Sequence, residues 1–183
     1  MTPAQNSLIK ADVLASADMN TLPANADGAF EIARLYNLPS TTDVWRTEVP
    51  TKLIFDAIDW AKYTPTDVAD ATAIFTNRML IIQTKQMNLQ NMLVGRDVVD
   101  ASRSNIRAGL RDAVISLPAG ALGATVSAGG AGGVTVLTAC LRKATRIEKL
   151  LASAPFTTGT VSAGVMGFEG NVSYQDIEAA RAS

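Results

Sequence analysis

The chain has 183 residues, no histidine, one cysteine (Cys140) and a formal net charge of −1. Without histidine it lacks the commonest general base and metal ligand, and one cysteine allows neither an intrachain disulfide nor a cysteine zinc cluster. No apolar run reaches the roughly 18 residues that a membrane-spanning helix needs. These features argue against metalloenzymes, Ser-His-Asp hydrolases and disulfide scaffolds, and they favour a soluble structural or binding protein with no membrane partner.

Charge is distributed unevenly along the chain. Residues 1–75 carry 5 basic and 10 acidic side chains, residues 76–149 carry 10 and 4, and residues 150–183 carry 1 and 3. Three interpretations stay open: acidic and basic segments that pack within one fold, opposite faces that meet between neighbouring copies, or a basic segment that faces nucleic acid. The third interpretation lacks the interleaved basic and aromatic residues of a nucleic-acid surface.

Capping residues and apolar spacing predict three short helices in the first third of the chain. They cover residues 4–18, 29–36 and 52–62. Between the last two, residues 40–50 form a polar connector that holds Trp45. We expect Trp45 and Trp60 to be anchors of the core or of an interface, because tryptophan is rarely found on an exposed surface that contacts nothing.

The segment from Asp67 to Val94 contains neither proline nor glycine and carries the longest helical pattern. Its stripe recurs every three or four positions, through Val68, Ala71, Phe75, Met79, Ile82, Gln86, Leu89 and Leu93. We therefore expect one continuous helix of about 42 Å, the backbone of the fold. Two further helices are predicted, one from about residue 97 or 104 to 117 and one over 134–153.

Residues 119–133 hold six glycines, five alanines and no charge. They predict a flexible or loosely packed loop, because the Gly-Lys-Ser/Thr of a phosphate-binding loop does not follow. The pairs Asp56 with Asp59 and Asp67 with Asp70 lie at or near helix starts or on exposed faces, where aspartate is favourable. Cys140 lies in an apolar stripe and is expected to be a buried, inert thiol. We expect no catalytic residue, cofactor or metal.

The predicted helix 134–153 carries four basic residues on the face opposite its apolar stripe. They are Arg142, Lys143, Arg146 and Lys149. We interpret them as a basic face that meets solvent or a partner rather than as a surface that reads nucleic acid.

After Pro155 the composition changes to one rich in threonine, valine and glycine. We expect an extended arm or short hairpin over 157–170, and then a helix over 174–182 that begins with a capping box at Ser173 and Asp176. Four apolar or aromatic positions are candidate docking residues: Val161, Val165, Phe168 and Tyr174. The predicted fold class is mainly α: a helical bundle over 1–154 with one very long helix, about 67–94, and an extended C-terminal docking arm, 155–183, with a short β element and a terminal helix.

Three groups of residues together resemble a family of small proteins encoded in the structural-gene clusters of tailed bacteriophages. They are 22–33 (LPANADGAFEIA) with Asn37 and 44–47 (VWRT); 105–110 (NIRAGL); and 142–152 (RKATRIEKLLA) with Phe168-Glu169-Gly170 and Ser173-Tyr174-Gln175-Asp176. The likeness covers most of the chain and is weakest at 66–100 and 119–133. None of these motifs is an enzymatic signature.

The resemblance implies a virion component, assembled in the host cytoplasm, and within that class a head-to-tail adaptor (a neck or connector protein). Such adaptors are helical bundles that form a homo-oligomeric ring beneath the portal, contact portal and tail proteins and lie along the path of packaged DNA, with a C-terminal arm docked on a neighbour. Two alternatives stay open: a minor tail or fibre-attachment protein, and a packaging accessory protein that binds nucleic acid through the basic segment 76–149.

Overall fold

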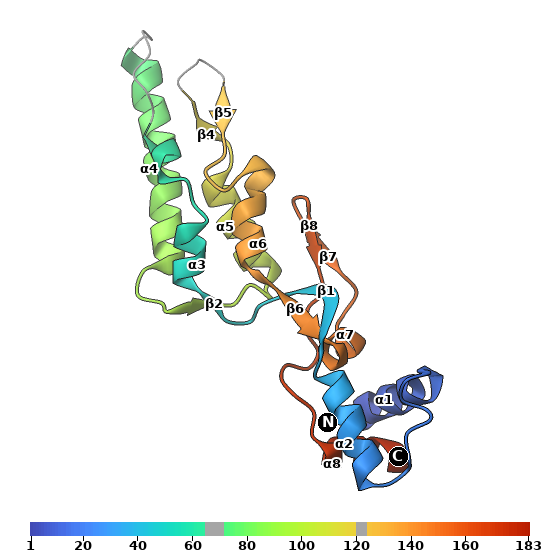
Figure 1. The fold of residues 1–183 in the computed structure, drawn as a ribbon. Coiled ribbons are helices and arrows are strands. Elements are labelled where there is room, and N and C mark those ends of the chain that lie inside the picture. The colour runs from blue at the N-terminus through green and yellow to red at the C-terminus, as the bar shows by residue number, and fades with distance from the viewer. Residues whose placement is uncertain (65–71, 120–123) are drawn as a thin grey trace. The chain divides into compact units, whose positions relative to one another are not determined.

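The structure, a computed structural model, describes residues 1–64, 72–119 and 124–183, and in it the chain divides into two compact units (Figure 1). Unit 1 consists of Met1–Val44, Arg142–Pro155 and Ala163–Ser183, and unit 2 of Trp45–Leu141 and Phe156–Ser162. The chain crosses from one unit to the other four times. Each unit is therefore assembled from segments that lie far apart in the sequence.

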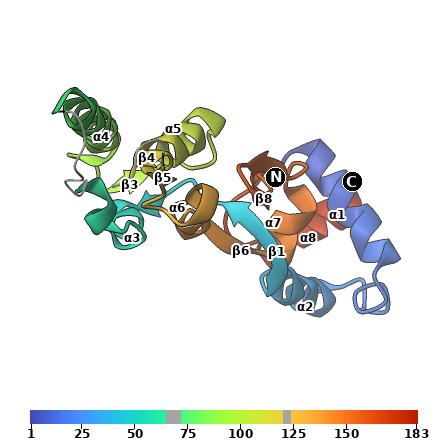
Figure 2. The same cartoon turned by 90° about the horizontal axis from the view of Figure 1, so that it is seen from above.

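Unit 1 is built around four helices: α1 (Pro3–Ala15), α2 (Ala26–Tyr36), α7 (Arg146–Leu151) and α8 (Tyr174–Ala182). Figure 2 shows α8 beside α1, and α2 also contacts α8. Their inward faces make one apolar core of buried side chains, among them Ile9, Val13, Met19, Ile32, Tyr36, Ile147, Val172, Ile177 and Ala180. The first and last helices of the chain thus share one core.

Each helix of unit 1 begins at a residue whose side chain accepts a backbone N–H of the first turn. These residues are Thr2, Asn25, Thr145 and Ser173. At Thr2, Thr145 and Ser173 the cap is reciprocal, since the side chains of Gln5, Glu148 and Asp176 accept the cap residue's own N–H. The predicted helix over 174–182 and its capping box are present.

Strand β1 (Pro39–Trp45) pairs with β6 (Leu141–Thr145). The sequence predicts a polar connector over 40–50 and one helix over 134–153, and both predictions are wrong here. The predicted helix is instead α6 (Val134–Ala139), strand β6 and helix α7. The interruption has two physical causes: β6 gains a partner strand about a hundred positions earlier in the chain, and the Thr145 capping box starts a new helix.

In unit 2, α4 (Thr72–Leu93) packs against α5 (Ser104–Val114), and α5 packs against α6. The remaining elements are α3 (Thr51–Asp56), the 3₁₀ helices η1 (Trp60–Tyr63) and η2 (Ala131–Gly133), and the short strand pairs β2 (Val49–Pro50) with β3 (Val98–Val99), β4 (Leu117–Pro118) with β5 (Thr125–Val126) and β7 (Phe156–Thr158) with β8 (Val161–Ala163). The buried side chains of unit 2 include Trp45, Ile54, Ile82, Leu89, Leu110 and Leu137.

The expected fold class, a helical bundle with one very long helix and an extended arm, is contradicted. The described part of the chain holds eight α-helices together with four two-stranded sheets. Helix α4 has 22 residues and begins at Thr72; the predicted start, Asp67 to Ala71, lies outside the described residues. A second, shorter set of helices forms its own core in unit 1, so α4 is not the backbone of the whole fold.

The segment 155–183 is also not an extended arm. Residues 163–183 belong to unit 1, where Val172, Ile177 and Ala180 lie in the core, and residues 156–162 belong to unit 2. The observed division therefore differs from the expected one at residue 154. The expected hairpin is present as β7 and β8.

The glycine-rich stretch 119–133 was expected to be loosely packed, and its described part, 124–133, is closely packed in places. Ala128 and Gly129 are buried, and a Cβ at Gly129 would stand 2.6 Å from a methyl carbon of Val114. Small residues are needed here because two chain segments approach each other more closely than a side chain allows.

Candidate docking surfaces

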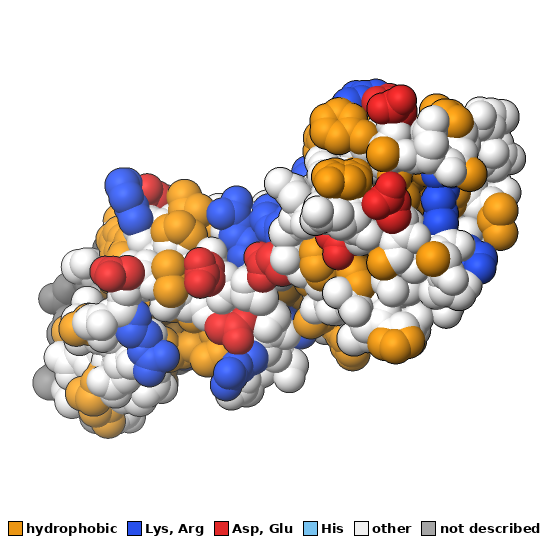
Figure 3. Space-filling view, turned by 90° about the horizontal axis from the view of Figure 1, so that it is seen from below, with side chains coloured by type: hydrophobic (Ala, Val, Ile, Leu, Met, Phe, Trp, Pro, Cys, Tyr) orange, Lys and Arg blue, Asp and Glu red, His pale blue; other side chains and the backbone are white. Residues whose placement is uncertain are grey.

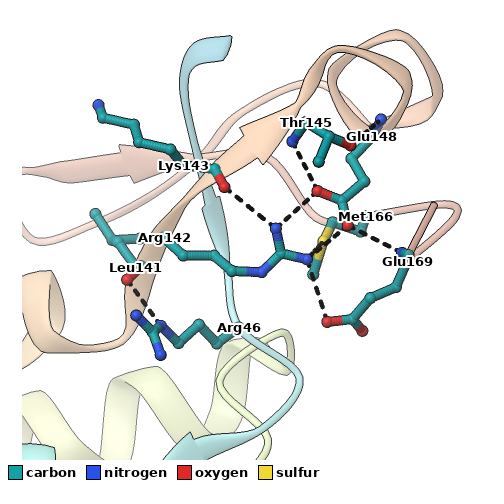
Figure 4. Close-up of polar contacts among 9 residues, drawn as sticks. Arg46, Leu141, Arg142, Lys143, Thr145, Glu148, Met166 and Glu169 are labelled. Atoms are coloured by element: carbon teal, nitrogen blue, oxygen red, sulfur yellow. Dashed lines mark hydrogen bonds and ion pairs between the residues drawn. The ribbon is translucent and has the colours of Figure 1, made fainter. Parts of the chain in front are cut away.

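A polar cluster inside unit 1 is centred on Arg142 and Glu148 (Figure 4). The guanidinium donates to both carboxylate oxygens of Glu148, each at 2.7 Å, and also to Met166 Sδ at 3.0 Å and to Glu169 Oε1 at 3.3 Å. The Glu148 carboxylate accepts two further N–H groups, from Thr145 at 2.8 Å and from Gly170 at 3.0 Å. The cluster fastens the segment 166–170 to the start of α7.

Burial alone would raise the pKa of the Glu148 carboxyl, because its side chain is 2% exposed. The hydrogen bonds from Arg142 and from the backbone N–H groups of Thr145 and Gly170 outweigh burial and lower that pKa to about 2. Glu148 is therefore a fixed anion with every acceptor site used. It holds structure and has no free lone pair for proton transfer.

Most of the expected basic face is neutralised where it stands. Three of its four side chains form ion pairs within unit 1: Arg142 with Glu148, Lys143 with Asp43 at 2.9 Å, and Arg146 with Asp18 at 2.6 Å. Of these four residues, Lys149 is the one that is exposed and forms no ion pair with any described residue. The same cancellation holds for whole units, whose formal charges are −2 for unit 1 and +1 for unit 2. The uneven charge along the sequence is therefore absent from the folded units.

The four expected docking residues do not share one surface. Val161 is buried in unit 2, whereas the other three belong to unit 1. There, Val165 is half-buried and Phe168 packs against the core. Only Tyr174, at the start of α8, is 40% exposed. Of the four, Tyr174 alone is available to a partner.

Tyr174 lines an open groove of about 550 Å³ between α2 and the start of α8. The groove is bordered by Phe30, Ala33, Arg34, Asn37, Leu38, Val172 and Ser173. Phe30 is 64% exposed and Leu38 is 44% exposed. Together with the ring of Tyr174, these two side chains form an exposed cluster along the groove. Exposed clusters of this kind are typical of protein-binding sites.

Sequence reasoning missed Phe30, although a signal was present. Helix α2 buries Ala29, Ile32, Ala33 and Tyr36, which already form a complete stripe at three- and four-residue spacing. Phe30 lies outside that stripe and is exposed. An aromatic residue left over from a complete core stripe indicates a surface position with a role.

A second exposed apolar surface lies on the outward face of α4 in unit 2. Helix α4 buries Ile82, Leu89 and Leu93 against the core, yet Leu80, Met87 and Val94 are 58–69% exposed. The spacing of these three residues is seven, which places them on one face, opposite the buried stripe. This outward face thus carries three exposed apolar side chains among exposed amide and hydroxyl side chains such as Asn77, Gln83 and Thr84.

A third cluster, Arg107 with Trp45, is wholly structural. The Arg107 guanidinium lies 4.6 Å from the centre of the Trp45 ring and donates to Ala101 O at 2.8 Å, Ser102 O at 2.7 Å and Thr158 Oγ1 at 3.1 Å. Arg107 is 2% exposed and Trp45 is fully buried, so neither reaches a ligand. The sequence predicts that Trp45 and Trp60 are anchors of the core or of an interface; Trp45 is buried in the core, whereas Trp60 is 40% exposed.

Of the residues considered as reactive groups, Cys140 is buried, and Asp56 and Asp59 make structural contacts. Burial raises the pKa of the Cys140 thiol to about 12, so it carries almost no thiolate. Asp56 pairs with Lys52 at 2.6 Å and Asp59 caps η1, whereas Asp67 and Asp70 lie outside the described residues. Within the described ranges, no group of three or more acidic or cysteine residues is placed to hold a metal ion.

The surface carries mixed charge. Figure 3 shows lysine and arginine scattered among aspartate and glutamate over the face it draws, with hydrophobic side chains between them. None of the described helices is long and apolar enough to cross a membrane.

A scan against models of protein families, a search of curated proteins and a search of solved structures each find no match.

Proposed function

We propose that this chain is a non-enzymatic structural subunit of a tailed-phage virion, a head-to-tail adaptor that forms a ring between portal and tail. The observation that carries the proposal is where the residues that resemble the phage family lie. Some of them fix contacts between chain segments inside each unit, whereas others, including Phe30 and Tyr174, are exposed and line the α2–α8 groove.

Four contacts illustrate the first group. Gly28 packs against the backbone of Pro23, and the Asn37 side chain bonds the backbone N–H and C=O of Val172 at 2.9 and 3.0 Å. Trp45 stacks with Arg107, and Arg142 pairs with Glu148. Residues that hold chain segments together stabilise the fold and take no part in a reaction. A family likeness carried by such residues supports a shared structural part, in agreement with a virion role.

The exposed surfaces support assembly. Each unit presents large apolar side chains to solvent, Phe30 and Leu38 on unit 1 and Leu80 and Met87 on unit 2. Apolar surface of this kind is stabilised when partners cover it. A subunit of a ring has a neighbour on each side and meets this requirement.

The nucleic-acid alternative is less well supported. Binding to phosphates needs cations that are free to replace counterions. Arg142, Lys143 and Arg146 are held by acidic partners, and Arg107 is buried. The minor-tail and fibre-attachment alternative fits the same apolar surfaces, and the choice of partner separates it from the adaptor.

The test is binding to the portal protein of the same phage. Purified chain and portal are mixed and imaged by negative stain, and purified virions are analysed by mass spectrometry. We expect the chain in virions and an added ring coaxial with the portal. Binding to a fibre protein but not to portal would overturn the adaptor role, and binding to DNA that weakens steeply with salt would favour the packaging alternative.

A further inference from the structure

We propose that Arg46, Arg142 and Lys143 block the two edges of the β1–β6 sheet, because their side chains occupy backbone carbonyls that a strand from another chain would need. A strand at the edge of a sheet offers unpaired N–H and C=O groups, which are a template for strand addition by other molecules. A two-stranded sheet has two such edges. The proposal concerns what keeps these edges closed, and it does not depend on the proposed function.

The residues that flank the strands show which backbone groups face outward. Arg46 N donates to Cys140 O at 3.0 Å. Arg146 N donates to Leu38 O at 2.9 Å. Since the backbone groups of alternate residues in a strand point toward the same edge, the even-numbered positions face the partner strand. The odd-numbered positions of β1 and β6 therefore present their N–H and C=O groups to the outer edges.

Two carbonyls on the outer edge of β6 are occupied by arginine side chains (Figure 4). Leu141 O accepts a hydrogen bond from Arg46 Nε at 2.9 Å. Lys143 O accepts one from Arg142 Nη1 at 3.2 Å. An incoming strand would have to displace both arginines before it could donate to these carbonyls.

Arg142 is held in this position by further contacts. Its guanidinium also donates to both carboxylate oxygens of Glu148, each at 2.7 Å. The same carboxylate accepts the N–H of Thr145 at 2.8 Å, which is the next outward-facing group of β6. Three successive outward positions, 141, 143 and 145, are thus bonded to side chains.

The outer edge of β1 is closed by a lysine and by a neighbouring segment. Thr41 O accepts a hydrogen bond from Lys143 Nζ at 3.1 Å. Asp43 O accepts one from the backbone N–H of Gly164 at 3.2 Å. Lys143 is held in place by an ion pair with the Asp43 side chain at 2.9 Å. The cation therefore reaches from β6 across the sheet to the far edge.

Arg46 shows that the blocking contacts are more than a by-product of ion pairing. Within residues 1–64, 72–119 and 124–183 it forms no ion pair, and its side chain donates to Leu141 O. Two copies that met edge to edge would also bring cations against each other, and like charges across a strand pair are destabilising. The cations thus oppose strand pairing twice, through occupied carbonyls and through repulsion.

Methionine tests the contacts, because it keeps much of the length of these side chains and removes their N–H donors. One variant carries Arg46→Met with Lys143→Met. We expect it to form intermolecular β-sheet at a concentration about tenfold lower than the native chain, the effect of roughly one regained backbone hydrogen bond. Sedimentation measures the association. The infrared amide band of intermolecular strands distinguishes it from a ring that assembles through other surfaces.

A matched control removes the same charge elsewhere. Arg103→Met with Lys149→Met changes two exposed cations for which the structure gives no bond to a strand carbonyl. This control should associate like the native chain. A chain with Arg46→Lys and Lys143→Arg keeps both cations and their donors, and it should also stay like the native chain.

Lys143→Met alone guards against a double variant that fails to fold, because the Lys143 side chain is 56% exposed. Circular dichroism and thermal melts check the fold of each chain. If folded Lys143→Met and the double variant give no more intermolecular β-sheet than the native chain, the proposal is wrong; a double variant that fails to fold leaves the decision to Lys143→Met. An equal increase in the Arg103→Met, Lys149→Met control would assign the association to lost charge and would also overturn it. Binding to portal is a separate measurement, so the two proposals fail separately.

Discussion

The Arg142 guanidinium donates hydrogen bonds to both carboxylate oxygens of Glu148, with each N–O distance at 2.7 Å. Glu148 is nearly fully buried, whereas the Arg142 side chain keeps 25% exposure. The same carboxylate caps α7 and holds the N–H of Gly170, so one anion joins three chain segments. Removing its charge should therefore affect unit 1 as a whole.

The first prediction is that Glu148→Gln destabilises the protein by about 2–3 kcal/mol, somewhat less than the loss of a fully buried ion pair because Arg142 is partly solvated. The amide keeps the shape but turns one acceptor into a donor facing Arg142. Chemical denaturation measures the change. Asp56→Asn breaks an exposed pair with Lys52 and should cost less than about 0.5 kcal/mol; equal losses from both variants would contradict the role given to Glu148.

The second prediction concerns acid. The pKa of Glu148 is lowered to about 2 in the folded chain, below the unfolded value of about 4.3. A lowered folded pKa stabilises the protein above the unfolded pKa, and that stability is lost as the pH falls from about 5 toward 2. Melting temperatures over this window should fall more steeply for the native chain than for Glu148→Gln. Parallel curves would assign the acid response to other carboxylates.

The third prediction compares two glycines within helices. A Cβ at Gly28 would stand 2.0 Å from the carbonyl oxygen of Pro23, a backbone atom that cannot turn away, whereas at Gly109 it would meet the flexible end of Met92 at 3.0 Å. Gly28→Ala should lower stability by about 1–3 kcal/mol. Gly109→Ala should be neutral or stabilise by up to about 1 kcal/mol, because alanine favours helix. Thermal melts separate the two, and the reverse order would contradict the packing described.

The fourth prediction concerns Arg107. Arg107→Ala removes the stacking on Trp45 and three hydrogen bonds, and should cost about 3 kcal/mol or more. In a Trp60→Phe chain the remaining tryptophan emission reports on Trp45 and should shift to longer wavelength. Arg103→Ala, at a side chain 70% exposed beside the same helix, is the control and should leave both stability and emission nearly unchanged.

Elements set by local signals could be predicted from the sequence. The observed α1, α2, α5 and α8 start close to their predicted positions, because each carries a cap or a clear apolar stripe within its own residues. Trp45 as a core anchor and Cys140 as a buried thiol follow in the same way from their neighbours. The prediction of one helix over 134–153 was wrong because the apolar spacing continues without interruption through residues 141–145, where the structure has a strand. Only the distant strand β1 makes 141–145 extended.

The candidate site was less predictable for the same reason. The glycines after Pro155 do weaken local structure, but α8 is held by α1 and α2, which lie more than a hundred residues away. Lys143 and Arg146, which were expected on one free basic face, are paired with Asp43 and Asp18 from distant segments. The groove combines α2 with the start of α8, and no pattern within either segment reveals it.

The last prediction concerns the C-terminal helix. Ile177 and Ala180 of α8 are fully buried among residues of α1 and α2, and Arg181 donates to Pro23 O at 2.8 Å. Ile177→Ala should therefore cost about 2–5 kcal/mol, as for other buried large-to-small changes, and deletion of 174–183 should unfold unit 1 rather than free an arm. Hydrogen exchange should then lose protection in α1 and α2, while Glu178→Ala, on the exposed face of α8, should leave it intact. If α1 and α2 stay protected after the deletion, α8 is an attachment to unit 1 and not part of its core.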